Sequence, residues 1–269
     1  MHTHSTYSAD GESPLADMVG AARSLGLKYF GTAEHFDFDY TALGLRYEDG
    51  SLPHTDAAGY FSAARALQGR NGGGFEYLAG CEFGYTDDAA ACERYVAVVA
   101  EYSPDFIVNS VHTCDGADSW YASYFNGRDK QSAYSSYLKR VKRSLSAPYD
   151  YDIVAHIGYV SRNAPYPDPK LRYAEFKDLY DDILSEIIAR GKILEVNSSS
   201  RGAGSSFLPD ADVLAAYRAL GGRKVCFASD AHSVGRIALN GAEAAALLKS
   251  LGFEYLTVPC RGRHIEVEI

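Results

Sequence analysis

The chain has 269 residues, 46% apolar and 23% charged, with a net charge of −9. This is the composition of a folded globular protein. It excludes a disordered chain and, with no apolar run near the roughly 20 residues that span a bilayer, a membrane-spanning one. The acidic balance argues against general binding to nucleic acid or anionic membranes. Five cysteines without a CxxC or CxxH pair, and no visible secretory signal, favour a reduced, cytoplasmic protein.

Short β-branched or aromatic runs alternate along the chain with segments of helical period. The predicted strands are residues 28–33, 76–81, 106–110, 152–155, 192–197 and 224–228, with a further candidate at 255–258. The predicted helices are residues 14–25, 57–68, 88–102, 131–146, 173–190, 210–220 and 238–251. Glycines directly follow four of these helices, where a left-handed residue ends a helix well.

This alternation predicts βαβ units and a parallel sheet. About seven such units follow one another, and no Pro/Gly/Ser linker or repeat divides the chain. We therefore expect an α/β protein in which residues 1–269 form one domain, a closed β/α barrel.

Six of the eight histidines lie at or just after the end of a predicted strand or in the first residues of the chain. They are His2, His4, His35, His112, His156 and His232, and the carboxylates Asp10, Glu34, Glu82 and Asp230 lie in the same places. The carboxyl ends of barrel strands meet at one rim, so these side chains should converge there. Taken singly, each histidine could instead cap backbone carbonyls. Together they predict a site for two or three zinc, manganese or iron ions.

The segment from His2 to Gly11, with the sequence HTHSTYSADG, resembles the first motif of the polymerase-and-histidinol-phosphatase (PHP) superfamily. The later pieces follow in that family's order: Glu34-His35, Gly80-Cys-Glu82, Ser110-Val-His112, Ala155-His156 and Ser229-Asp230-Ala-His232. The resemblance covers nearly the whole chain. It implies a distorted (β/α)7 barrel with a trinuclear metal centre at the carboxyl ends of the strands.

Within the superfamily, residues 109–116, 156–162 and 194–201 are most similar to the monofunctional histidinol-phosphate phosphatases. That resemblance implies that Arg162 and Arg201 contact the substrate phosphate. Asp10 stands where many relatives carry a third histidine. The chain begins Met1-His2, whereas relatives have several residues before this motif, so either the first strand is nearly absent or the natural start lies upstream.

The resemblance also implies how the ligands are shared. The first ion would be held by His2, His4, Glu82 and Asp230, the second by Glu82, His112 and His156, and the third by Asp10, His35 and His232. Three divalent ions against three carboxylates leave about +3, which suits a phosphate dianion. The expected nucleophile is a metal-bound hydroxide. Asp230 or a metal-bound water could serve the leaving alcohol, and Glu34 is expected to orient a ligand.

Two long segments, residues 36–56 and 113–129, should lie on the same rim. The second carries Trp120, Tyr121, Tyr124 and Phe125. These aromatic side chains could contact a small organic phosphate ester, or they could pack the loop against the barrel.

The function expected from this resemblance is metal-dependent hydrolysis of L-histidinol phosphate in histidine biosynthesis, which releases inorganic phosphate. Three alternatives remain open: a PHP phosphoesterase acting on a nucleotide or oligonucleotide, a metallohydrolase acting on C–N bonds, and a metal-binding protein without catalysis. The acidic charge favours a small phosphate ester over nucleic acid. The sequence does not indicate an oligomeric state.

Overall fold

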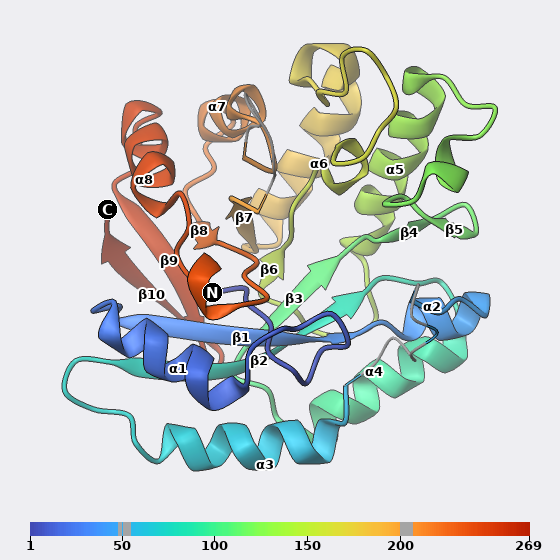
Figure 1. Ribbon diagram of the computed structural model, residues 1–269. Helices are drawn as coiled ribbons and strands as arrows, with labels where there is room; N and C mark the ends of the chain where they lie inside the picture. Colours follow the sequence, from blue (N-terminus) through green and yellow to red (C-terminus); the bar gives the residue numbers. More distant parts are fainter. Residues whose placement is uncertain (48–49, 51–54, 200–206) are drawn as a thin grey trace.

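The computed structural model describes residues 1–47, 50, 55–199 and 207–269. Its centre is a six-stranded sheet in the order β1-β2-β3-β6-β7-β8, in which every neighbouring pair is parallel. These strands are β1 (Tyr29–Phe36), β2 (Glu76–Gly84), β3 (Ile107–Ser110), β6 (Ile153–Val154), β7 (Ile193–Asn197) and β8 (Val225–Ala228). The sheet curls into a half-barrel (Figure 1), and each strand overlaps a predicted one.

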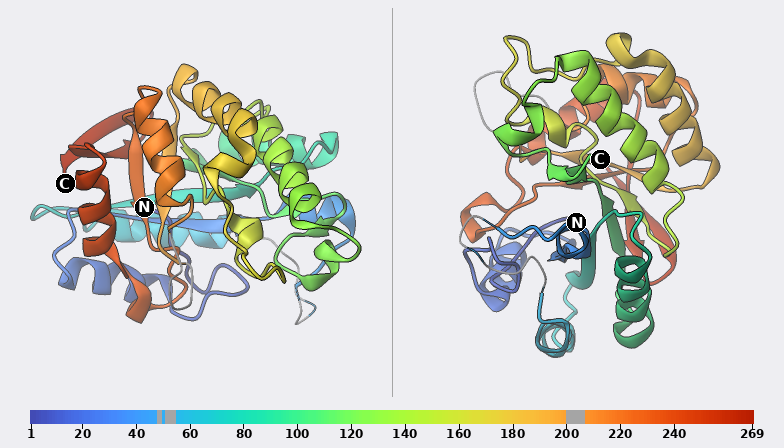
Figure 2. Two further views of the ribbon diagram at one scale, coloured as in Figure 1. Left: turned by 90° about the horizontal axis from the view of Figure 1, so that it is seen from above. Right: turned by 90° about the vertical axis from the view of Figure 1, so that its right-hand side faces the viewer.

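The longer helices of the described chain cover the outer face of the curl (Figures 1 and 2). Helices α1, α3 and α4 lie below β1 and β2, and α5 to α8 lie along the other strands. They are α1 (Leu15–Ser24), α3 (Ala57–Gln68), α4 (Ala89–Tyr102), α5 (Lys130–Ser144), α6 (Lys177–Ala189), α7 (Ala211–Ala219) and α8 (Gly241–Ser250). The side chains of Asp56, Asp88 and Asp129 accept hydrogen bonds from the first turns of α3, α4 and α5, which fixes where these helices begin. Within the described part of the chain, no helix is long and apolar enough to cross a membrane.

The candidate strand at 255–258 forms, but it does not join the parallel sheet. It is β9 (Tyr255–Cys260), which pairs antiparallel with β10 (Arg263–Glu268). Only Arg261 and Gly262 connect the two strands, and both have positive φ. So short a connection can form a hairpin, whereas a parallel pair needs a long crossover.

The sequence patterns missed the shortest elements. These are α2 (Phe38–Leu43), the hairpin of β4 (Thr113–Cys114) and β5 (Ala117–Asp118), and 3-10 helices at Ala122–Phe125, Tyr159–Ser161 and Val234–Arg236. A further 3-10 helix, Tyr173–Phe176, forms the start of the predicted helix at 173–190. Most of them lie in the two long rim segments or directly after a strand. The rim is therefore built from short turns that have no periodic signal of their own.

The first four residues lie between β1 and β8, inside the curl (Figure 1). The Ala33 amide of β1 donates to the Thr3 carbonyl at 2.8 Å. On the other side, the His4 amide donates to the carbonyl of Ala231, directly beyond β8, at 2.8 Å, and Thr3 bridges Ala231 in parallel register. The chain terminus is thus held on both sides, although it has hardly any residues before its first histidine.

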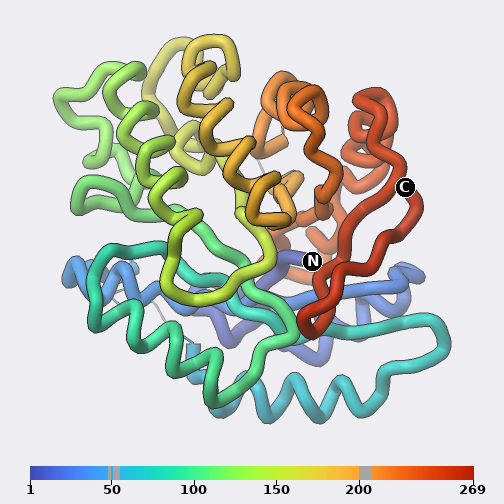
Figure 3. The backbone as a smooth tube through the Cα atoms, turned by 180° about the vertical axis from the view of Figure 1, so that it is seen from behind, coloured from blue at the N-terminus to red at the C-terminus, as the bar shows by residue number. Residues whose placement is uncertain are grey.

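The concave face of the sheet carries a small apolar layer below the polar rim. Leu78, Val108, Ile193 and Cys226 project into it from four strands, and the β9–β10 hairpin covers it with Val258 and Cys260. Figure 3 shows the molecule from behind, with this hairpin at the end of the row formed by α5 to α8. The helices cover the opposite face, where a larger apolar cluster lies. The sheet is therefore apolar on both faces, except at its carboxyl end.

The buried ring of Phe106 fills the bottom of the concave face and needs glycine on two strands. A Cβ atom added at Gly80 would lie 2.5 Å from the Phe106 ring, and one added at Gly31 would lie 2.8 Å from it. Because the ring is only 1% exposed, it cannot move aside into solvent.

We expect Gly80→Ala to lower the free energy of unfolding by about 1–3 kcal/mol, because the new methyl group overpacks this layer. The matched control is Gly20→Ala on the exposed side of α1, where a Cβ meets nothing within 4 Å. It should raise the free energy of unfolding by about 0.5–1 kcal/mol. Urea unfolding followed by circular dichroism measures both, and equal stability of the two variants would contradict the packing described.

Candidate metal centre

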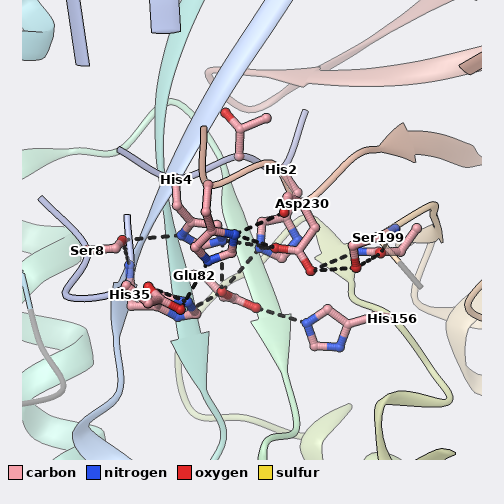
Figure 4. A network of polar contacts seen from close by, with 12 residues as sticks. His2, His4, Ser8, His35, Glu82, His156, Ser199 and Asp230 are labelled. Atoms are coloured by element: carbon pink, nitrogen blue, oxygen red, sulfur yellow. Dashed lines mark hydrogen bonds and ion pairs between the residues drawn. The ribbon is translucent and has the colours of Figure 1, made fainter. Parts of the chain in front are cut away.

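The structure brings nine sequence-predicted side chains to the carboxyl end of the sheet, and Figure 4 labels His2, His4, His35, Glu82, His156 and Asp230 among them. They lie on or just beyond β1, β2, β3, β6 and β8 and in the N-terminal segment, whereas β7 supplies none of the nine. His35 lies on β1, Glu82 on β2 and Asp230 two residues beyond β8, while His2 and His4 come from the segment between β8 and β1. The remaining residues of the set are Asp10, His112, His156 and His232.

Glu82 lies at the middle of this cluster and is 1% exposed. Its Oε2 atom is 3.1 Å from His2 Nε2 and 3.0 Å from His35 Nδ1. Its Oε1 atom is 3.2 Å from His112 Nε2 and 3.0 Å from His156 Nε2. Its Oε2 atom is also 3.5 Å from His4 Nε2. One carboxylate is therefore shared by five imidazoles that come from four different parts of the chain.

Asp230 forms a second acidic point on the side of the N-terminal segment. Its Oδ1 atom is 3.3 Å from His4 Nε2 and 3.9 Å from His2 Nε2. The backbone of Asp230 is left-handed, with a φ of 49°, which is costly for a residue with a side chain and is typical of functional sites. Its other oxygen, Oδ2, accepts a hydrogen bond from Arg162 Nη2 at 3.0 Å.

Asp10 closes the cluster at its open edge. Its carboxylate is 3.2 Å from His232 Nε2 and 3.8 Å from His35 Nε2, and its side chain is 50% exposed. The His4 ring packs against both other imidazoles, with its centroid 4.2 Å from that of His35 and 4.3 Å from that of His232. The group of Asp10, His35 and His232 is therefore the part of the cluster that solvent reaches.

Several buried polar atoms in the cluster have no hydrogen-bond partner among the described residues. They include His2 Nε2, His4 Nε2, His35 Nδ1, Glu82 Oε2 and His232 Nε2. Buried polar atoms in proteins are nearly always paired, so such a concentration needs a ligand. Imidazole nitrogens mixed with carboxylate oxygens suit zinc, manganese or iron.

Three groups of ligand atoms, each within 4.8 Å of one another, follow the predicted sharing in part. They are His2–His4–Asp230, His2–Glu82–His156 and His4–His35–His232. The first falls within the ligands expected for the first ion. The second contains two residues of the second set together with His2, and the third contains two residues of the third set together with His4. The residues present therefore fit a centre of closely spaced divalent ions.

The electrostatics of the cluster keep its carboxylates ionised and affect its imidazoles unequally. Burial alone would raise the pKa of Glu82, but the imidazoles of His2, His35 and His112 hold it well below its usual range. Burial and the neighbouring imidazoles lower the pKa of His4 to about 3, so its ring is neutral. Despite burial, the surrounding carboxylates raise the pKa of His2 to about 10 and the pKa of His35 and of His112 well above the usual value. Bound metal ions would replace the protons on these rings, because a coordinating imidazole is neutral.

Two carboxylates that the sequence patterns missed hold the ligands from behind. Glu195, on β7, lies 2.7 Å from His2 Nδ1 through Oε1 and accepts the His156 amide at 2.7 Å through Oε2. Asp37 lies 3.4 Å from the Nδ1 atoms of both His35 and His112, and these three residues form a further candidate group. Such partners fix the orientation of ligand histidines. An acidic residue in the otherwise apolar β7, Ile193–Asn197, was the available signal for Glu195.

Glu34 also orients the site, through the loop that carries His4. Its carboxylate accepts hydrogen bonds from the Ser5 hydroxyl at 2.7 Å and the Ser8 hydroxyl at 2.6 Å. Ser8 Oγ in turn lies 3.2 Å from His4 Nδ1 (Figure 4). Although Glu34 directly precedes His35 in the sequence, its carboxylate holds the loop that carries His4.

Arg162 is the predicted phosphate-binding residue that the structure describes. Its guanidinium contacts Asp230, Asn197 and Ser199 beside the cluster. Its Nε atom is buried without a hydrogen-bond partner. Arg201, the other predicted phosphate ligand, lies outside the described residues.

The rim aromatic residues divide between two roles. Tyr124 and Phe125 are buried in the outer core, as loop packing requires. Trp120 is 40% exposed, in the stretch that follows the β4–β5 hairpin.

Comparisons with known proteins point to one family. The family model described as the PHP domain matches residues 1–199. The chain is 25% identical over 256 residues to a histidinol-phosphatase of Lactococcus lactis, covering 95% of this chain and 91% of that protein. It is 26% identical over 242 residues to a Clostridium acetobutylicum protein named "Probable histidinol-phosphatase", covering 89% and 88%.

Among solved structures, the fold is similar to that of histidinol phosphate phosphatase from Lactococcus lactis, crystallised with zinc, L-histidinol and phosphate. The TM-score is 0.84 at 24% identity, and the match covers 98% of this chain and 97% of that one.

We expect Glu195→Gln to weaken divalent-metal binding about 10- to 100-fold, because the amide cannot support the His2 ring as the carboxylate does. The matched control is Glu186→Gln, on the exposed face of α6, where Glu186 pairs only with Arg190. Competition with a fluorescent chelator measures the affinity of each variant. Equal affinities in the two variants would show that Glu195 does not support the metal ligands.

Proposed function

The chain belongs to the PHP family, and on that premise we propose that it is a metal-dependent phosphomonoesterase that hydrolyses L-histidinol phosphate to L-histidinol and phosphate in histidine biosynthesis. The observation that carries this proposal is the buried cluster of histidines and carboxylates around Glu82 with Arg162 beside it. The chain also matches histidinol-phosphatases over about nine-tenths of its length.

We assign two or three zinc, manganese or iron ions to the cluster. The first would be held by His2, His4, Glu82 and Asp230, the second by Glu82, His112 and His156, and the third by Asp10, His35 and His232. Divalent ions bound there would lower the pKa of water and offset the charge of a phosphoryl group. Glu82 supports this sharing because both of its oxygens face imidazoles.

Arg162 would bind the phosphate of the substrate. Its contacts with Asp230 and Asn197 fix the guanidinium beside the cluster, and its Nε atom has no hydrogen-bond partner among the described residues. Hydrogen bonds between guanidinium and phosphate are among the strongest in proteins. Arg201 is proposed as a second donor to the same phosphate.

Asp230 would handle the proton of the reaction. Despite burial, His2 and Arg162 help hold its pKa well below its usual range, so the carboxylate is ionised at neutral pH. An ionised carboxylate can accept a proton from the attacking water as the new P–O bond forms, and its low pKa favours passing that proton on. The same proton can pass to the alcohol oxygen of L-histidinol as the ester P–O bond breaks.

We also propose how the N-terminal segment completes the fold and where in the cell the protein acts. Residues 1–4 join β8 to β1 through backbone hydrogen bonds, and we propose that they serve as the first strand of the barrel. With that segment, the six-stranded sheet becomes a distorted (β/α)7 barrel formed by one domain, residues 1–269. We place the protein in the cytoplasm, with a small phosphate ester as its substrate.

We expect purified protein supplied with manganese or zinc to release phosphate from L-histidinol phosphate, and a chelator to abolish the activity. Turnover of L-histidinol phosphate should exceed that of a nucleoside monophosphate and of an aryl phosphate by at least tenfold in kcat/KM. A preference for the nucleotide would retain the metal-dependent chemistry and contradict the assigned substrate. Full turnover in the presence of chelator would contradict the metal-dependent mechanism itself.

We expect Arg162→Ala to lower kcat/KM about 10- to 100-fold, the loss typical of one charge-assisted hydrogen bond. Inhibition by inorganic phosphate should weaken in parallel, which steady-state kinetics with added phosphate measures. Arg172→Ala is the control, because Arg172 is exposed and pairs only with Asp168 four residues away. Unchanged phosphate inhibition in Arg162→Ala would remove Arg162 from the phosphate site.

A further inference from the structure

Trp120 is the single tryptophan of the chain, and it is exposed where its neighbours are buried. Tyr124 and Phe125, from the same rim segment, are 2% and 4% exposed, whereas Trp120 is 40% exposed. Leaving a large apolar ring in water forgoes the stabilisation that burial would bring. An exposed aromatic residue at the mouth of a site is therefore a candidate ligand contact.

Tyr159 connects Trp120 to the metal cluster. The Tyr159 ring centroid is 5.0 Å from that of His112, 5.3 Å from that of His156 and 5.9 Å from that of Trp120. We call Trp120 and Tyr159 together the aromatic wall. It runs from two predicted metal ligands outward to solvent.

The aromatic wall is held in place by Asp118, on β5. Its Oδ1 atom accepts the Trp120 amide at 2.6 Å, and its Oδ2 atom accepts the hydroxyls of Tyr40 and, at 3.4 Å, Tyr159. On the outer side, Asn163 Nδ2 donates to the Trp120 carbonyl at 3.3 Å. Both oxygens of Asp118 are thus used within the protein. The Trp120 backbone and the Tyr159 hydroxyl are therefore held before a ligand arrives, which reduces the entropic cost of binding.

Arg162 lies at the inner end of the aromatic wall, next to Tyr159. Its guanidinium carbon lies 5.2 Å from the centre of the Tyr159 ring, while the same guanidinium contacts Asp230. Phosphate bound by Arg162 would lie at the inner end of the wall, and Trp120 would lie at the outer end. A substrate that reaches both ends needs a phosphate and a flat or cationic group, separated by a short chain.

We propose that the aromatic wall is the subsite for the imidazole ring of the substrate. This inference rests on the proposed function, because L-histidinol phosphate carries its ring three carbon atoms from the ester oxygen. Imidazole stacks on aromatic faces, and its protonated form also gains a cation–π contribution. Trp120 and Tyr159 thereby select the alcohol, while the metal cluster and Arg162 act on the phosphate that all such esters share.

The first test uses Trp120 itself as the probe, since its emission is the only tryptophan signal of the protein. L-Histidinol should quench this emission saturably in the metal-loaded protein, whereas ethanolamine, which lacks the ring, should leave it unchanged. Quenching by both compounds, or by neither, would overturn the subsite. The assay measures binding of the product alcohol, so its result stands even if the enzyme acts on a different ester.

The second test is selectivity. We expect Trp120→Ala to reduce about tenfold the ratio of kcat/KM for L-histidinol phosphate to that for 2-aminoethyl phosphate, which has no ring. Trp120→Phe should restore most of the ratio, because it retains an aromatic face. Tyr255→Ala is the control, since Tyr255 is similarly exposed, at 42%, but lies on β9.

The two tests separate the possible failures. An unchanged ratio in Trp120→Ala, or failure of Trp120→Phe to recover it, overturns the subsite while hydrolysis of L-histidinol phosphate stands. If wild-type protein hydrolyses 2-aminoethyl phosphate but not L-histidinol phosphate, the proposed substrate has failed. The quenching result then decides the subsite on its own.

Discussion

A buried carboxylate that faces five imidazoles is the constraint on which the rest of this structure depends. Glu82 is almost fully buried, and a buried charge is costly unless other charges or metal ions compensate it. The five imidazoles around it come from parts of the chain up to 154 residues apart and belong to His2, His4, His35, His112 and His156. Only a sheet whose strand ends curl toward one another can bring them to one carboxylate.

The layers below and around Glu82 follow from this requirement. The concave face is polar at the strand ends and apolar beneath, where Phe106 packs on Gly31 and Gly80 without space for side chains. Outside the ligands lies a second set of carboxylates, among them Asp37 and Glu195, which hold imidazoles by their Nδ1 atoms. The ligand geometry is therefore set by the protein, and ions bound there need little rearrangement of it.

The sequence predicted the site better than it predicted the rim. Histidines after apolar runs were visible because strand ends and ligand positions coincide, and all seven long helices had periodic patterns. The short helix α2 was not predictable, because six residues are too few to form a helix alone. It depends on tertiary contacts such as that of Arg94 over the Phe38 ring. Asp37 was missed for a related reason: a single acidic residue after a strand has no pattern until His35 and His112 are placed around it.

The central claim is that Glu82 is shared between bound ions, and counting metal in the folded chain tests it most directly. Elemental analysis of wild-type protein and of Glu82→Ala, both reconstituted with manganese or zinc, gives the number of ions per chain. We predict two or three ions in the wild type and the joint loss of at least two in the variant, with an unchanged circular dichroism spectrum. A variant that retains every ion and its turnover would contradict the shared carboxylate and the mechanism built on it.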